Sequence, residues 1–281
     1  MPAVRRPFTM GLAALSFVFQ AGPALAANPQ SPGADVTFAD LADLADSAPM
    51  VVEAQVTRMT RLGAERAPGL APGIGRFYVE ADTRALLVGN SPIGESLRYL
   101  VDMPLDSRGK GEDLKDQMVI LFARAVPGRP GEVQLIEPDS QLLFTPSLDG
   151  KLRGLLRETV APDAPGEITG VRELLYVPGA LAGQGETQIF LNTKDGSAAS
   201  ITVRHEPGRP VAWGASFSEL VADVTQPPAP ETLEWYRLAC ALPEYPPQGA
   251  NISQGYDAKR QAQDDYRAVR RQLGPCTRNR S

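Results

Sequence analysis

Residues 77–84, FYVEADTR, alternate Phe77, Val79 and Ala81 with the polar or amphipathic Tyr78, Glu80 and Asp82. This period of two is typical of a β-strand with one buried face and one solvated face. The same alternation runs through residues 52–57 and 97–102. We therefore expect half-buried strands of an antiparallel sheet in all three places.

Residues 118–122, MVILF, are continuously apolar, which indicates a strand covered on both faces. Residues 133–136 are expected to form a fifth strand, brought back by the Pro- and Gly-containing turn at 127–131. A short helix should begin at Thr37, whose hydroxyl can cap it. Five such strands with a flanking helix fit a small closed or partly closed barrel, and the chain as a whole is expected to be α+β.

The stretches 48–56, 78–89, 97–102 and 119–122 together resemble OB-like barrel domains of uncharacterised exported bacterial proteins. The shared features are a first strand of alternating small apolar residues, a second strand ending in Leu87-Val88-Gly89, and an apolar fourth strand. The whole chain also resembles a family of uncharacterised envelope proteins of Gram-negative bacteria. That resemblance implies a compartment and no particular activity.

The N-terminus has the order of a secretory signal peptide, which we place at residues 1–27. Arg5 and Arg6 precede the apolar stretch 10–19, and the small residues 24–27 offer cleavage after Ala26 or Ala27. This stretch is much shorter than the roughly 20 residues of a membrane span. The prediction is a periplasmic protein with no membrane span after cleavage. The general secretory route is favoured, although the pair Arg5-Arg6 followed by Phe8 also resembles a twin-arginine signal.

Three regions are expected after the signal peptide: an OB-like β domain over 28–161, a hairpin-rich segment over 162–226 and a helical region over 227–281. Helices are predicted at 148–160, 231–241 and 256–273, and a further one at 216–224 from the capping pattern Ser216-Phe217-Ser218-Glu219. Strands are predicted at 168–177, 187–193 and 200–205, with a further one at 211–214. The sequence leaves open whether the two β regions form one domain or two.

Cys240 and Cys276 are the only two cysteines and are expected to form a disulfide, as an even pair usually does in an oxidising compartment. A redox-active pair normally has C-x-x-C spacing, which is absent here. With two cysteines and one histidine, a metal site is hard to assemble, and we predict neither metal nor cofactor.

The mature chain would carry 26 basic and 33 acidic residues. This acidic balance disfavours nucleic acid and anionic membranes as partners, since their binding depends on basic charge. The expected partner is an unknown protein or envelope ligand, and the oligomeric state stays open.

Candidate residues for chemistry are few, because the common nucleotide-binding and hydrolase motifs are absent. A Ser-His-Asp triad would need His205, which is otherwise expected to face solvent at the end of a strand. Glu80 and Asp82, with Tyr78, share one face of a strand and are either a carboxylate pair or ordinary solvated residues. The acidic residues of 256–273, including Asp265, are expected on a solvated helix face, and Trp213 and Trp235 in the core or in a ligand groove.

No catalytic site is predicted. The sequence favours a non-catalytic periplasmic binding or protein-interaction protein, with the face of the OB-like barrel as its surface. The alternatives are a periplasmic hydrolase that uses carboxylates or His205, and a structural component of the cell envelope. Fold resemblance alone does not decide among them.

Overall fold

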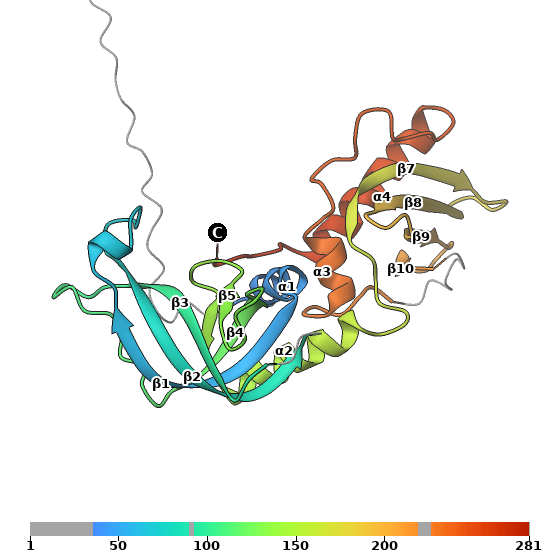
Figure 1. Cartoon of the computed structure of the whole chain (residues 1–281). Coiled ribbons are helices and arrows are strands. Elements are labelled where there is room, and N and C mark those ends of the chain that lie inside the picture. Colours follow the sequence, from blue (N-terminus) through green and yellow to red (C-terminus); the bar gives the residue numbers. More distant parts are fainter. Residues whose placement is uncertain (1–35, 90–92, 219–225, 281) are drawn as a thin grey trace, which may run out of the picture.

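The computed structural model describes residues 36–89, 93–218 and 226–280. Figure 1 shows a barrel-like sheet and a second sheet, with a layer of helices between them. The predicted signal peptide lies outside the described residues, as does most of the helix predicted at 216–224. Ser216 itself ends a strand rather than opening a helix. The mixed α+β class is confirmed.

The N-terminal sheet is a nearly closed, five-stranded OB-like barrel. Its strands are β1 (Met50–Arg61), β2 (Ile74–Val88), β3 (Ser96–Pro104), β4 (Met118–Ala125) and β5 (Val133–Leu135), hydrogen-bonded in the order β3-β2-β1-β4-β5. A parallel bridge between Arg98 and Glu132 joins the two ends of this order. A short 3₁₀ helix, η1 (Ala64–Arg66), lies between β1 and β2, and a short strand that was not predicted, β6 (Gln141–Leu143), pairs with β4.

Strand β4 is buried on both faces, as its unbroken apolar sequence predicts. Val119 and Leu121 point into the barrel core. Ile120 and Phe122 point the other way, into a second cluster that contains the helices. The strand is therefore the wall that separates two hydrophobic cores.

Three helices form the middle layer: α1 (Phe38–Ser47), α2 (Pro146–Thr159) and α3 (Leu233–Ala239). Helix α1 begins at the predicted cap Thr37, which forms a reciprocal capping box with Asp40, and Thr145 caps α2. Leu41, Leu152 and Leu233 from the three helices are buried in one cluster with Phe122. The layer thus fastens the barrel to the C-terminal part of the chain.

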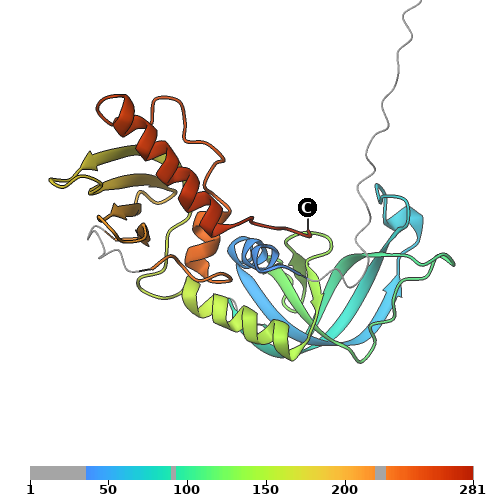
Figure 2. The same cartoon turned by 180° about the vertical axis from the view of Figure 1, so that it is seen from behind.

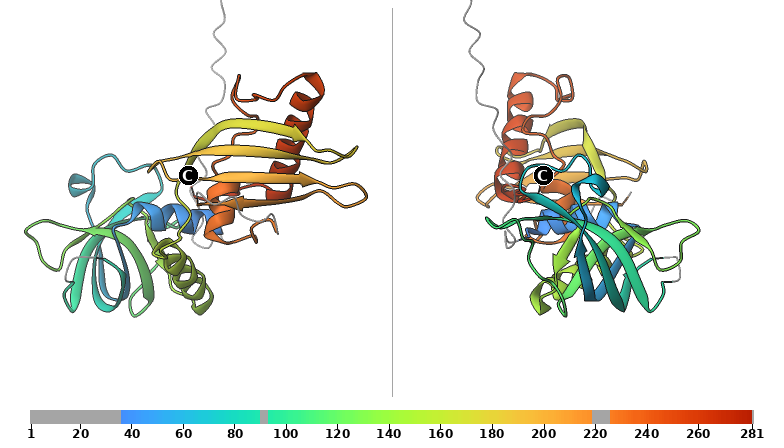
Figure 3. Two further views of the ribbon diagram at one scale, coloured as in Figure 1. Left: turned by 90° about the vertical axis from the view of Figure 1, so that its right-hand side faces the viewer. Right: turned by 60° about the vertical axis from the view of Figure 1, so that its left-hand side comes forward.

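The second sheet is antiparallel and has the order β10-β9-β8-β7. Its strands are β7 (Ile168–Pro178), β8 (Gly185–Thr193), β9 (Ser200–His205) and β10 (Ala212–Ser216). Helix α4 (Tyr256–Leu273) lies across one face of it (Figure 3) and shares one hydrophobic core with all four strands and with α3. Sheet and C-terminal helices therefore fold as one packed unit.

The predicted disulfide is present between Cys240, at the end of α3, and Cys276, just after α4. From Cys276 the chain turns back toward α1 and the barrel, as Figure 2 shows from behind. We call residues 275–280 the C-terminal strap. Among the described residues, no helix is both long enough and apolar enough to cross a membrane.

Candidate functional site

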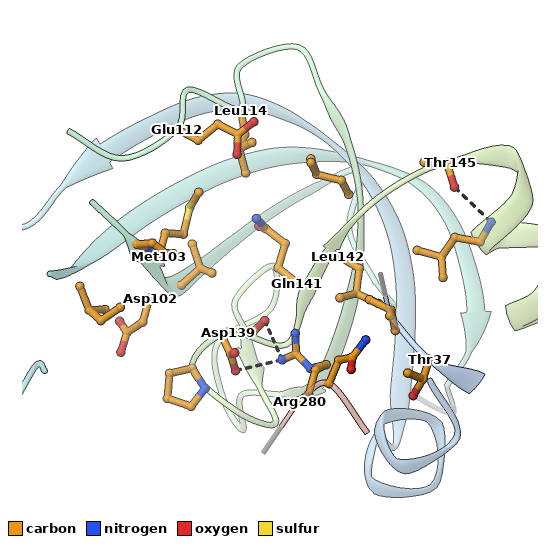
Figure 4. A pocket seen from close by; sticks show the side chains of 18 of the residues that line it. Thr37, Asp102, Met103, Glu112, Leu114, Asp139, Gln141, Leu142, Thr145 and Arg280 are labelled. Atoms are coloured by element: carbon orange, nitrogen blue, oxygen red, sulfur yellow. Dashed lines mark hydrogen bonds and ion pairs between the residues drawn. The ribbon is translucent and has the colours of Figure 1, made fainter. Parts of the chain in front are cut away.

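A cleft of about 1200 Å³ lies beside the barrel, and we call it the main cleft. It lies among the barrel strands β2 and β3, strand β6, the starts of α1 and α2, and the C-terminal strap (Figure 4). Much of its lining is apolar and comes from Ile74, Met103, Leu114, Leu142, Leu143 and Leu148. It exceeds the 300–1000 Å³ typical of small-molecule sites.

The basic side chains of the main cleft are each paired with a carboxylate. Arg76 donates two hydrogen bonds to Asp102, at 2.6 and 2.7 Å, and this pairing raises the pKa of Arg76. Lys151 and Glu231 lie 3.0 Å apart. Arg280 lies 3.0 Å from a carboxylate oxygen of Asp139, which is the pair marked in Figure 4. Each of these cations therefore has an acidic partner, although Nε of Arg280 is buried without a hydrogen-bond partner among the described residues.

Tyr99 and Gln141 form a hydrogen bond beside the cleft. The Tyr99 hydroxyl donates to Gln141 Oε1 at 2.6 Å, and Gln141 lines the cleft. Burial raises the pKa of Tyr99 well above its ordinary value, so the phenol stays protonated and keeps donating. Gln141 is thereby fixed with its amide nitrogen free to meet a ligand oxygen.

One wall of the cleft is the C-terminal strap, held by the carboxylate of Asp40 in α1. The backbone N–H groups of Asn279 and Arg280 donate to Asp40 at 3.0–3.1 Å, and Thr37 donates to it as well. Burial opposes ionisation of Asp40, but these hydrogen bonds more than offset it and lower its pKa. Arg278 adds an ion pair to Asp43 on the same helix, at 2.5 Å. An ionised Asp40 therefore fixes the wall.

A smaller cavity of about 570 Å³ lies between β3 and β5. Backbone hydrogen bonds join the two edges of the barrel on either side of this cavity. They run from the N–H of Arg98 to the carbonyl of Gly131 and from the N–H of Asp102 to the carbonyl of Pro138. Tyr78 and Leu100 line this cavity, and neither belongs to the main cleft. Of the residues singled out from the sequence as candidates for chemistry, Tyr78 alone lines one of these two cavities.

Glu80 and Asp82 lie on the same face of β2 as expected, and they are partly exposed. Glu80 is 3.8 Å from Arg58 and Asp82 is 3.9 Å from Arg84. Neither carboxylate lines either cavity. The arrangement matches a solvated sheet face with loose ion pairs.

The expectation that His205 faces solvent is wrong. Its side chain is only 17% exposed, and its Nε2 lies 2.9 Å from Oδ1 of Asp265 on α4. Asp265 also accepts hydrogen bonds from Thr187 and, at 3.0 Å, from Gln261. The helix buries this carboxylate against the sheet, so the expectation of a solvated Asp265 is wrong as well.

This cluster joins α4 to β8 and β9 and differs from a hydrolytic triad. In a triad the imidazole accepts the hydrogen of the nucleophile, and the carboxylate orients the imidazole. Here the hydroxyl of Thr187 donates to Asp265 itself. His205 and Thr187 therefore share one acceptor, and the geometry is that of a satisfied buried carboxylate.

The two tryptophans serve packing. Trp213 is buried in the core of the second sheet, and its indole N–H donates to Gln272 at 2.6 Å. Trp235 donates to the carbonyl of Leu273 at 2.8 Å and packs edge-on against Phe38. In the described part of the chain, no cluster of three or more His, Cys, Asp or Glu side chains could hold a metal ion.

Sequence reasoning missed the residues that shape the main cleft. Arg76 and Asp102 lie on neighbouring strands and are 26 positions apart in the sequence. Arg280 and Asp139 are 141 positions apart. Such pairs become visible only once the strand register and the path of the strap are known. No protein-family model matches this chain, and neither does any curated protein.

Proposed function

We propose that the protein is an exported, non-catalytic binding protein whose ligand lies in the main cleft. The observation that carries the proposal is the composition of this cleft, which is mainly apolar and has basic groups that are already paired. Ligand sites are typically concave and mostly apolar, with a few polar groups that fix orientation. Reaction centres instead need reactive groups arranged around the substrate.

Export to the periplasm is part of this proposal. It is supported by the order of the first 27 residues, with Arg5 and Arg6 before an apolar stretch and small residues after it. The Cys240–Cys276 disulfide supports an oxidising compartment. The acidic balance of the chain supports a ligand other than nucleic acid.

The test is the binding of a neutral fluorescent naphthylamine dye, compared between two matched variants. Leu143 lines the main cleft and is 43% exposed, whereas Leu100 is 44% exposed and lies outside it. Replacing a contacting leucine by glutamine removes about 1 kcal/mol of apolar contact. We expect Leu143→Gln to weaken dye binding about fivefold and Leu100→Gln to leave it unchanged.

Two results would overturn the proposal. One is the absence of dye binding to the unmodified protein, and the other is an equal effect of the two variants. Circular dichroism of both variants checks that each has kept its fold.

The alternative is a hydrolase that uses His205, and one observation favours it. A buried carboxylate beside an imidazole is the arrangement that orients a catalytic histidine. The hydrogen bond from Thr187 to Asp265 argues against the hydrolase. The Thr187 hydroxyl donates to the carboxylate and not to the imidazole, so His205 is not placed to take its proton.

A further inference from the structure

The charges that line the main cleft do not balance. Six of them form the three pairs Arg76–Asp102, Lys151–Glu231 and Arg280–Asp139. The seventh is Glu112, an exposed carboxylate for which the described chain contains no ion pair within 4.0 Å. The cleft therefore offers one unmatched negative charge and no unmatched positive charge.

Glu112 places the unmatched negative charge at one side of the main cleft. Figure 4 shows Glu112 and Leu114 across the cavity from Asp139 and Arg280. Met103, Leu114 and Leu142 are apolar lining residues, and Gln141 lies among them. A molecule with its charge at Glu112 can therefore lay a hydrocarbon chain along the apolar lining.

On the basis of the proposed function, we infer that the main cleft selects an elongated apolar molecule bearing a primary ammonium group. Its charge pairs with Glu112, and its hydrocarbon chain contacts Met103, Leu114 and Leu142. A carboxylate or phosphate head would instead meet Glu112 with no free base nearby, because each base of the lining is bound to an acid. At the exposed Glu112, an ammonium head would be attracted and an anionic head repelled.

The test uses three probes of equal chain length that differ in their head group: decylammonium, decanol and decanoate. Each displaces the naphthylamine dye from the full-length mature protein at pH 7 and low salt. We expect decylammonium to bind about fivefold more tightly than decanol, the upper end of the effect of one exposed ion pair. Decanoate should bind more weakly than decanol, and added salt should shrink both differences.

Two variants that change the net charge equally distinguish the local effect of the Glu112 charge from the electrostatic field of the whole protein. Glu112→Gln should bring decylammonium to the affinity of decanol. Glu244→Gln, at an exposed carboxylate outside the cleft, should keep the fivefold preference.

The outcomes distinguish this inference from the proposed function. If the dye itself does not bind, both fail. If the dye binds but none of the three probes displaces it, the ammonium inference is overturned and the proposed function stands. If decanol binds and decylammonium has no advantage, or if the advantage survives in Glu112→Gln, the ammonium preference is overturned while the cleft remains a binding site.

Discussion

Asp265 is the residue whose removal we expect to cost most. It is buried between α4 and the second sheet and accepts hydrogen bonds from Thr187, His205 and Gln261. Asp265→Ala leaves the buried Thr187 hydroxyl unsatisfied and opens a cavity. Its expected effect is a loss of roughly 2–4 kcal/mol in the free energy of unfolding, measured by urea denaturation.

His205→Gln is the matched control, since a glutamine amide can replace Nε2 as a donor to Asp265. It should cost under about 1.5 kcal/mol, the worth of one ordinary hydrogen bond. The same variant tests the hydrolase alternative, which requires that a folded His205→Gln protein lose an ester hydrolysis that the parent shows. Similar stability losses in Asp265→Ala and His205→Gln would contradict the assigned role of Asp265.

The sequence predicts only part of the environment of Asp265. The apolar stripe of α4 includes Ala262, Tyr266 and Val269, and Asp265 follows Ala262 by three positions. Helical spacing therefore places it on the buried face, so its burial was predictable. Its donors were not, because Thr187 and His205 come from strands 60 or more positions away.

At the scale of elements, the contact between α1 and the C-terminal strap is expected to depend on pH. Hydrogen bonds from Thr37, Asn279 and Arg280 lower the pKa of Asp40 despite its burial. A lowered pKa in the folded state gives stability that is present above the unfolded pKa of about 3.9 and is lost as pH falls below it. The stability contributed by the contact should therefore decrease progressively as pH falls below about 4.

Asp40→Asn tests this dependence. At pH 7 it should lower the free energy of unfolding by about 1–2 kcal/mol, because one amide cannot accept all of these bonds. At pH 2–3 the difference from the parent should narrow, since the unfolded parent chain then binds a proton that the folded state resists. Asp163→Asn, at an exposed carboxylate, should show no such narrowing. A difference that stays constant with pH would contradict the role of Asp40.

The elements themselves were largely predictable because their signals are local. Period-two alternation marked β2 and β3, the apolar run marked β4, and capping residues marked α1. Strand β6 was missed because it has only three residues and depends on pairing with β4. The main cleft was missed for the same physical reason, since its walls meet only after strands, helices and strap have packed.

At the scale of the whole molecule, the disulfide fixes the origin of the strap. Cys276 is bonded to Cys240 over a separation of 36 residues. Loop-entropy arithmetic gives roughly 3–4 kcal/mol of stabilisation for a closed loop of this length. The double variant Cys240→Ala/Cys276→Ala should lose about this much in urea denaturation at pH 7.

Mass spectrometry after alkylation provides the accompanying check on protein isolated without reductant. Two modified thiols should appear only when reductant is added first. Two modified thiols without reductant would contradict the crosslink in the cell.

The contact between Asp40 and the strap also implies an order of events during folding. It joins positions 239 and 240 residues apart, so it is among the most non-local contacts of the fold. Non-local contacts form late, because the chain entropy of closing a long loop must first be overcome. Without residues 279 and 280 this wall of the cleft is missing. The main cleft is therefore expected to be completed only when these residues dock on α1, late in folding.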